Sequence, residues 1–273
     1  MKLLLWIGNE SNQKALANKL AEEFNVVGIV TETRLSKRKI TLRKVFDSAF
    51  EKLFLPSINN AWLGMKDHYD KQYSDYPNSK RIDVENINSE DAFEFSKKLN
   101  PDLIIVSGTR LVKSKMLSIK TNKGILNLHT GLSPYVKGGP NCTNWCIATN
   151  QFHIIGNTIM WIDEGIDSGN IVTTEFADVN WSDTLLNIHI SVMEHAHALY
   201  VKAVKFTSQG NNSNVEQSKL GEGKTYYTKE WKLKNKINLI INLKKYRRQF
   251  SKEGLTKKRK NIKIVEITIG NKT

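Results

Sequence analysis

The chain has 273 residues, of which 40% are hydrophobic and 25% charged, and its formal net charge is +14. This length suits one large domain, or one domain with a small appendage, of ordinary globular composition. No apolar run approaches the roughly 18 residues of a membrane span. The short apolar start, Met1–Gly8, is followed by polar residues instead of a cleavage site, so we expect a first buried strand there and no signal peptide.

The positive charge gathers at the end of the chain. Residues 229–273 hold 15 Lys or Arg against three acids, or +12, which leaves about +2 for residues 1–228. Such a segment can contact phosphates, nucleic acid or an anionic membrane surface, or it can be a solvated face.

The pattern from the start of the chain predicts a β-α-β unit with parallel strands. A strand over Lys2–Ile7, a helix over Asn9–Phe24 and a strand over Asn25–Val30 make it up. The turn after the first strand, Gly8-Asn-Glu-Ser, lacks the dinucleotide-binding spacing of glycines. Residues 31–80 are less regular, with one helix-like run over Val45–Leu55.

A second set of elements follows, with a helix that begins near Asn88–Asp91 on capping chemistry and ends at Asn100-Pro101. The expected strands are Arg81–Val84, Leu103–Val106, Ile125–His129, Ile154–Ile162, Ile171–Val179 and a β-like run over Asn261–Ile269. The expected helices are Pro140–Asn150, a long helix from residue 182 or 183 to about Phe206, and a basic amphipathic segment over Lys232–Phe250. The composition of residues 210–214 marks a linker.

One motif stands at the end of the strand expected over Ile125–His129. Asn127 and His129 are two residues apart in a strand, so both side chains project from one face. This arrangement can bring an oxyanion donor and a proton acceptor to one reacting carbon. Alone, a histidine here is more often structural than catalytic.

The two cysteines, Cys142 and Cys146, are spaced for adjacent turns of one helix. A disulfide framework is not expected from so few, and no further Cys or His has a suitable spacing for a metal. Nor are His189, His195 and His197 four residues apart, so we expect structural roles for them and no metal. Two thiols in a reducing cytoplasm is the simplest expectation.

The sequence between Asn127 and Gly169 resembles that of the folate-dependent formyltransferases. This family includes glycinamide ribonucleotide, methionyl-tRNA and sugar N-formyltransferases. The resemblance is carried by Asn127-Leu-His129, by Leu132-Ser-Pro134 with Gly138 or Gly139, by Gly156-Asn-Thr-Ile-Met160 and by Asp163-Glu-Gly165-Ile-Asp167-Ser-Gly169. Gly131 and Ser133 depart from the family's usual Ser or Ala and Leu, and suggest a changed loop lining for a different acceptor.

The resemblance implies an α/β fold: a Rossmann-like, mostly parallel sheet with flanking helices, plus a small C-terminal α+β extension. We expect a catalytic domain over residues 1–208 and a small basic C-terminal region over residues 209–273. The implied reaction moves a formyl group from N10-formyltetrahydrofolate to an amine. No metal and no covalent enzyme intermediate are needed.

The implied roles agree with the residue chemistry. Asn127 can donate a hydrogen bond to the carbonyl oxygen as it becomes negative. His129 can remove the amine proton or stabilise the developing charge, and Asp167 can orient His129 and favour its charged form. The resemblance places the pterin near Val106, Gly108 and Asp163, although Asp163 can equally cap a turn.

Among the acceptors, the resemblance favours a dTDP- or UDP-linked amino sugar, made for surface glycans or the O-antigen of lipopolysaccharide. Its sugar nucleotide would contact Gly8, Asn9, Lys80 and Tyr227. One alternative is a methionyl-tRNA formyltransferase-like enzyme, although the segment after the linker is short for the tRNA-binding barrel of that class. The other is a non-catalytic folate-binding domain. We expect a cytoplasmic homodimer that binds no nucleic acid and does not span a membrane.

Overall fold

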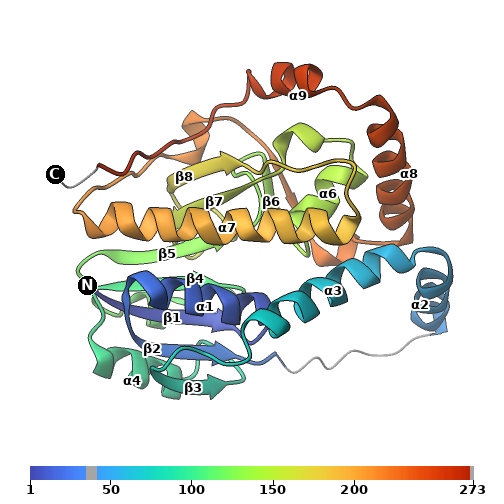
Figure 1. Cartoon of the computed structure of the whole chain (residues 1–273). Coiled ribbons are helices and arrows are strands. Elements are labelled where there is room, and N and C mark those ends of the chain that lie inside the picture. Colours follow the sequence, from blue (N-terminus) through green and yellow to red (C-terminus); the bar gives the residue numbers. More distant parts are fainter. Residues whose placement is uncertain (35–41, 271–273) are drawn as a thin grey trace.

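The computed structural model describes the backbone of residues 1–34 and 42–270, with the side chains of all of these except residues 42–47. A seven-stranded sheet in the order β3-β2-β1-β4-β5-β7-β8 lies at its centre (Figure 1). Its strands are β1 (Lys2–Gly8), β2 (Asn25–Glu32), β3 (Lys80–Val84), β4 (Leu103–Ser107), β5 (Gly124–His129), β7 (Gly156–Trp161) and β8 (Ile171–Phe176). In sheet order, the strands β3, β2, β1, β4 and β5 are parallel to one another. β7 runs antiparallel to β5, and β8 runs antiparallel to β7. The expected mostly parallel α/β sheet is confirmed.

Helices cover both faces of this sheet. The helices of the first 208 residues are α1 (Ser11–Glu23), α2 (Leu42–Phe54), α3 (Pro56–Gln72), α4 (Glu90–Leu99), α5 (Ser114–Leu117), α6 (Cys142–Ala148) and α7 (Leu185–Ser208), with a 3-10 turn over Phe152–Ile154. The later elements are β9 (Lys224–Tyr226), α8 (Leu233–Gln249) and α9 (Lys252–Arg259), with 3-10 turns over Gln217–Lys219 and Thr228–Glu230. A second, two-stranded sheet joins β9 to β6 (Val136–Gly138).

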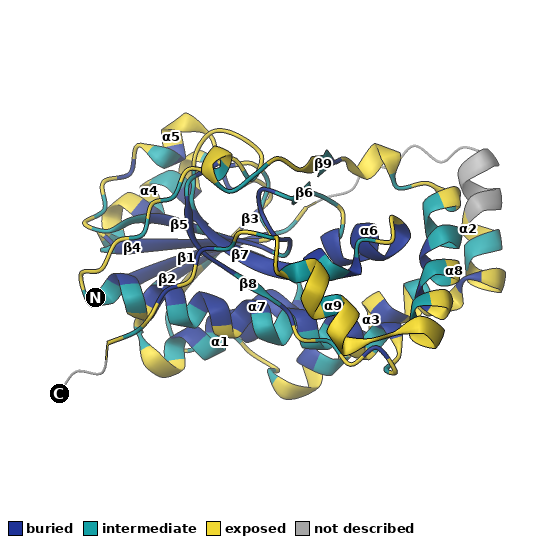
Figure 2. Ribbon diagram, turned by 90° about the horizontal axis from the view of Figure 1, so that it is seen from above, coloured by how far each residue is buried: buried dark blue, intermediate teal, exposed yellow. Residues whose placement is uncertain are grey.

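The first strand shows how the sheet divides the core into two layers. Leu3, Leu5 and Ile7 pack in one apolar cluster with residues of α1 and α7, while Leu4 and Trp6 pack in another with residues of α4 and α5. Alternate residues of a strand point to opposite faces, so a nearly continuous apolar strand is buried on both sides. Figure 2 shows the strands as buried and the outer faces of the helices as exposed.

The start of α4 follows the capping chemistry of its sequence. Ser89 is the N-cap, and its hydroxyl accepts the backbone N–H of Ala92. The negative charge of Glu90 in the first turn interacts favourably with the positive end of the helix dipole. At the other end Asn100 takes a left-handed conformation with φ 45° just before Pro101. Both predicted ends of this helix are therefore confirmed.

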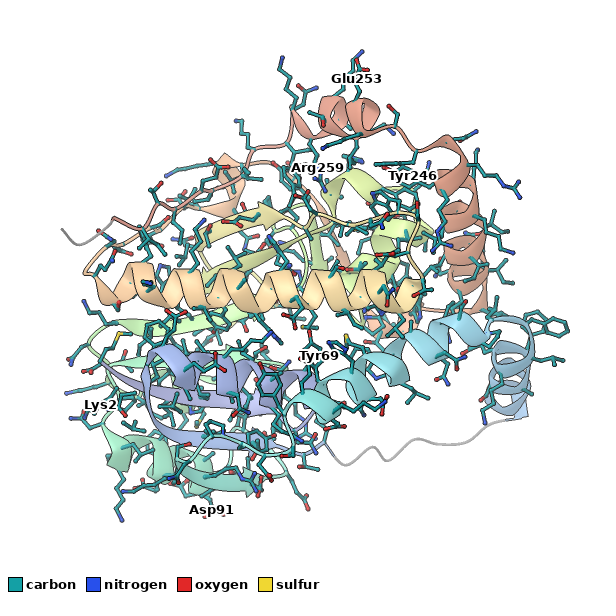
Figure 3. All side chains as sticks on the ribbon, viewed as in Figure 1. Lys2, Tyr69, Asp91, Tyr246, Glu253 and Arg259 are labelled. Atoms are coloured by element: carbon teal, nitrogen blue, oxygen red, sulfur yellow. The ribbon has the colours of Figure 1, made fainter. Side chains whose placement is uncertain are left out.

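The expectation of an irregular segment over residues 31–80 is wrong for residues 56–72, which form α3. Residues 35–41 of that segment lie outside the described residues. This helix buries only Ala61, Met65 and Tyr69, four residues apart, among polar neighbours. The stripe is too narrow to stand out as a helical period in the sequence. Figure 3 shows Tyr69 between α3 and α7, where its ring lies 5.6 Å from that of His197.

The residues after α7 pack on the main body in three places. β9 pairs with β6, α8 buries Leu239 and Leu243 beside α6, and the Val265 carbonyl accepts the Thr174 N–H of β8 at 2.7 Å. Arg259 of α9 stacks over the Phe176 ring at 4.5 Å (Figure 3). The expected strand over residues 261–269 does not form: residues 261 and 262 lie in a turn and a bend, and residues 263–269 have no regular secondary structure. Val265 bonds to Thr173 and Thr174 of β8.

In the part of the chain that the structure describes, no helix has both the length and the apolar character needed to cross a membrane.

Tyr200→Phe should test how the centre of the sheet is held together. The fully buried Tyr200 hydroxyl of α7 accepts the Val106 N–H at 3.0 Å and donates its single hydrogen to the Leu126 carbonyl at 2.7 Å, with the Val106 carbonyl 3.1 Å away. Its removal should lower the free energy of unfolding by about 1–3 kcal/mol, because a buried N–H loses a partner. Urea unfolding measures the loss. The control is Tyr73→Phe, because the Tyr73 hydroxyl makes no hydrogen bond within the described residues; this variant should leave the free energy of unfolding nearly unchanged. Equal losses in the two variants would contradict the role given to the Tyr200 hydroxyl.

Candidate active site

Asn127 and His129 lie at the carboxyl end of β5, where the parallel part of the sheet ends. Asn127 is in register with Val106 of β4 and Met160 of β7, and His129 is opposite Thr158. Asn127 is half-buried, and no residue in the described part of the chain forms a hydrogen bond to its side chain. Its amide can therefore donate to a ligand.

The imidazole of His129 is only 6% exposed and is held from both nitrogens. Nδ1 lies 3.2 Å from Oδ2 of Asp167, and Nε2 lies 2.9 Å from the carbonyl oxygen of Val136. The sulfur of Cys142 is 3.6 Å from Nε2. Because both main partners are acceptors, the protonated ring, which donates from both nitrogens, fits this position best.

This environment decides the charge of His129. Burial alone lowers the pKa of the imidazole, but the Asp167 carboxylate and the contacts with Cys142 and Val136 outweigh it and raise the pKa to about 10. Burial also raises the pKa of the Cys142 thiol, so that group stays neutral. At neutral pH the site thus holds an imidazolium–carboxylate pair.

The loop that carries Asp167 is held by residues far away in the chain. Asp167 itself has φ 50°, and its Oδ2 also accepts the Gly138 N–H at 2.9 Å. Gln217 donates through Nε2 to the carbonyl oxygens of Asp167 and Gly169, both at 2.8 Å. The C-terminal region therefore supplies part of the frame of the site.

Gly131 and Ser133, the two residues of the loop after β5 that depart from the family pattern, are both buried. A Cβ on Gly131 would lie 2.4 Å from Nε2 of His129 and 2.8 Å from the Val136 carbonyl oxygen. Gly131 thus lets the imidazole and its acceptor meet, and Ser133 is only 1% exposed. The expectation that these two residues line the surface of the loop for an acceptor is wrong.

Thr158 ties this loop to β7. Its hydroxyl accepts the Ser133 N–H at 2.9 Å and donates to the Gly131 carbonyl at 2.7 Å. A threonine in the middle of a strand therefore shapes the loop that covers His129.

The expected cofactor and substrate residues fall into separate groups. Gly8 and Gly108 meet at the carboxyl edge, since a Cβ on Gly8 would lie 2.8 Å from the Gly108 carbonyl oxygen. Asn9 is exposed beside them. The Val106 side chain, in contrast, is part of the apolar core, and its backbone N–H and carbonyl oxygen both bond to Tyr200.

Asp163, Tyr227 and Lys80 lie elsewhere. Asp163 accepts the Gly165 N–H and the Ser168 hydroxyl, so it closes a turn of its own loop. Tyr227 is 46% exposed just after β9. Lys80 begins β3, four residues before Val84 at the carboxyl edge, which puts it about 13 Å along the strand from that edge. The structure therefore does not bring Lys80 to the other site residues.

Two of the histidines expected to be structural or exposed, His189 and His197, are buried. Burial lowers the pKa of His189 to about 4 and that of His197 to about 3, so both are neutral. Cys142 and Cys146 are free and buried. Across residues 1–34 and 42–270, no three His, Cys, Asp or Glu side chains gather as metal ligands. Gln217, Cys142 and Thr158 were not expected at the site: Gln217 is 50 residues from Asp167, and no local pattern marks it.

Because the pKa of His129 is raised in the folded protein, the free energy of unfolding should fall as the pH becomes alkaline. The unfolded pKa is 6.5 and the folded one about 10, so the pair stabilises the fold fully below pH 6.5, and this contribution is lost as pH rises through 10. Asp167→Asn should bring the His129 pKa below 6.5, because burial then dominates. NMR titration of the imidazole carbons measures both values, and urea unfolding across this pH range measures the loss. A wild-type value near 6.5 would refute the pairing.

Comparison with known proteins finds a family match and partial relatives of this chain. The family model described as formyl transferase matches residues 59–204. The methionyl-tRNA formyltransferase of Clostridium tetani is 33% identical over 114 residues, which cover 42% of this chain and 36% of that protein. The one from Fusobacterium nucleatum is 25% identical over 186 residues, or 67% and 58%. The chain thus spans less than two thirds of the length of these relatives.

Solved structures share the fold over more of the chain. The N-formyltransferase from Helicobacter canadensis, in complex with folinic acid and dTDP-3-aminofucose, has a TM-score of 0.58 at 17% identity, covering 90% of this chain and 82% of that one. A sugar N-formyltransferase from a Shewanella species has 0.54 at 14% identity, with 89% and 88% covered. Glycinamide ribonucleotide transformylase 1 from Symbiobacterium toebii has 0.52 at 16%, with 80% and 93%.

These likenesses confirm the expected fold, and the family match covers both β5, which carries Asn127 and His129, and the loop that carries Asp167. Since that match spans more than half of the 273 residues, the chain belongs to the formyl transferase family.

Proposed function

We propose that this protein is an N-formyltransferase that moves a formyl group from N10-formyltetrahydrofolate to the amine of a dTDP- or UDP-linked amino sugar. The observation that carries the proposal is the constellation at the end of β5. Asn127, whose amide has no hydrogen-bond partner among the described residues, stands beside an imidazolium, His129, that Asp167 holds in its charged form. The family match adds its support.

The geometry favours one of the two roles considered for His129. An imidazole with a pKa of about 10 is protonated at neutral pH, so it cannot begin as a base. Its charge can instead stabilise the formyl oxygen as the amine attacks, while the Asn127 amide donates a hydrogen bond to that oxygen. Asp167 keeps the ring charged and oriented. A proton passes from the amine to N10 as the new C–N bond forms and the old one breaks.

The loops after β4 and β7 offer surfaces for a folate. They meet where the hydroxyl of Ser114, the first residue of α5, donates to Glu164. Leu111 on the first loop is 49% exposed and Ile166 on the second is 50% exposed. Two exposed apolar side chains on adjoining loops suit the faces of a pterin ring. The folate supplies the formyl carbon, and Gly108 and Asp163 belong to the loops that would border it.

A nucleotide-linked amino sugar is favoured as acceptor because of how residues 209–270 are used. They place Gln217 on the Asp167 loop and pair β9 with β6. This region also contains a single short strand in its described part, which does not suggest a separate barrel for gripping RNA. The structure from Helicobacter canadensis, which has a similar fold, was solved with a dTDP-linked amino sugar.

On this proposal, the sugar nucleotide lies near Gly8 and Asn9 at the carboxyl edge and extends to Tyr227, which is exposed just after β9. Lys80 is no longer included. The product would serve surface glycans such as the O-antigen of lipopolysaccharide. A homodimer in the cytoplasm, where buried thiols stay reduced, completes the proposal. A methionyl-tRNA acceptor is the second candidate, because the curated relatives are methionyl-tRNA formyltransferases and residues 229–273 carry +12.

Asn127→Ala and His129→Ala should remove nearly all formyl transfer while the fold remains. Loss of an oxyanion donor lowers kcat by about 10²–10³ in acyl-transfer enzymes, and we expect a similar fall for Asn127→Ala. Turnover assays with each variant measure this, with circular dichroism to check folding. His68→Ala on α3 is a matched control that should keep full activity. Undiminished turnover in either site variant would refute the proposed reaction.

A panel of acceptors identifies the substrate. We expect mass spectrometry to show one added formyl group on a dTDP- or UDP-linked amino sugar after incubation with N10-formyltetrahydrofolate. Formylation of methionyl-tRNA alone would mean that the acceptor proposed here is wrong. If the protein binds folate but no acceptor gains a formyl group, the non-catalytic alternative replaces the enzyme. Salt-sensitive binding of tRNA would separately support the nucleic-acid alternative.

A further inference from the structure

The last residue of β2, Glu32, is a fully buried carboxylate at the carboxyl edge of the sheet. Its side chain is 0% exposed. In the ladder it pairs with Gly8, the last residue of β1, and with Val84, the last residue of β3. Glu32 therefore stands among the ends of three strands whose loops border the candidate active site.

Glu32 holds a backbone N–H from each of three loops. Its Oε2 accepts the N–H of Arg110, after β4, at 2.7 Å, and its Oε1 accepts the N–H of Ile87, after β3, at 2.9 Å. Its main-chain carbonyl accepts the N–H of Asn9, after β1, at 3.2 Å. Only the first two of these bonds depend on the side chain.

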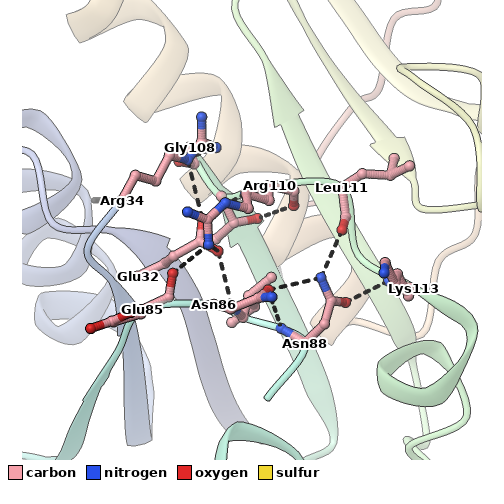
Figure 4. A network of polar contacts seen from close by, with 11 residues as sticks. Glu32, Arg34, Glu85, Asn86, Asn88, Gly108, Arg110, Leu111 and Lys113 are labelled. Atoms are coloured by element: carbon pink, nitrogen blue, oxygen red, sulfur yellow. Dashed lines mark hydrogen bonds and ion pairs between the residues drawn. The ribbon is translucent and has the colours of Figure 1, made fainter. Parts of the chain in front are cut away.

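Two arginines at the surface compensate the buried charge. Arg34 Nε lies 3.2 Å from Oε2, and Arg110 Nη1 lies 3.4 Å from Oε1. Arg34 also donates to the Gly108 carbonyl at 3.1 Å (Figure 4). Burying a carboxylate is costly unless it is paired and hydrogen-bonded, and apolar residues often stabilise a fold at least as well. Both oxygens of Glu32 are instead used to hold loops, which points to a positional role.

A third side chain, that of Asn88, also bonds to the backbone of this turn. Asn88, from the loop after β3, donates to the Leu111 carbonyl at 3.0 Å and accepts the Lys113 N–H at 2.7 Å (Figure 4). The side chains of Arg34, Glu32 and Asn88 thus form hydrogen bonds to four backbone groups of residues 108–113. The exposed Leu111 lies in the middle of this turn.

We infer that Glu32 is the positioning residue for the folate side of the site: it sets the turn over residues 108–111 through the Arg110 N–H. This inference rests on the proposed function. Because its side chain bonds to the loops after β3 and β4, while only its backbone bonds to Asn9, the side chain governs the formyl donor and not the acceptor.

Glu32→Gln tests this with almost no change of shape. A glutamine has one acceptor oxygen in place of two, so either Arg110 or Ile87 loses its partner. The KM for N10-formyltetrahydrofolate should rise about tenfold or more, the effect of losing one hydrogen bond to a charged group, with kcat and the acceptor KM unchanged. Equilibrium binding of folinic acid should weaken by the same factor.

Asp102→Asn is the matched control. Asp102 also accepts a backbone N–H, that of Lys2 at 2.7 Å, but at the start of β4, on the opposite edge of the sheet. This variant should leave both KM values unchanged.

The outcomes separate the inference from the function on which it rests. A wild-type protein that neither binds folinic acid nor transfers formyl groups would overturn both. If the wild type is active and Glu32→Gln binds folinic acid equally well, only the inference is overturned. A variant in which both KM values rise together, or in which kcat falls, would show a general structural role for Glu32 and would also overturn it.

Discussion

The ion pair between His129 and Asp167 is the interaction on which the rest of the site depends. An imidazole this deeply buried would be neutral without a carboxylate 3.2 Å from its Nδ1. The surroundings serve that pair: Gly131 leaves room for the ring, the Val136 carbonyl takes its second N–H, and Gln217 holds the loop of Asp167. The charge is thus built into the fold before any substrate arrives, which is the arrangement that stabilises a developing anion most effectively.

The carboxyl edge of the sheet has two anchored carboxylates with different tasks. Asp167 acts on the reacting group through His129, whereas Glu32 acts on the backbone of the loops around it. The C-terminal region belongs to the same design, since Gln217 and β9 reach the site from beyond residue 208. Whether residues 209–273 also form a unit of their own stays a prediction, but their described part is packed on α6 and β8.

Much of the fold followed from local patterns. The apolar strands of the β-α-β opening and the caps of α4 lie where periodicity and capping chemistry predicted them. The long α7 is also confirmed, but its N-cap is Thr184 and not the expected residue 182 or 183. α3 did not, because it buries one narrow stripe against α1 and α7, and its burial exists only once those helices are in place. Residues 261–269 have the alternation of a strand, yet too few of their backbone groups meet β8 to continue the sheet.

For the site, the sequence by itself determined the chemistry: an amide and an imidazole two residues apart on one strand face, and an acidic loop after the next strand. Strand geometry makes that face unavoidable. Only the tertiary structure decided the charge of His129, the buried positions of Gly131 and Ser133, and the distance of Lys80 from the edge. Burial, pKa and the bonds made by Glu32 and Gln217 all depend on which distant segments meet, and the order of residues along the chain does not contain that information in any local pattern.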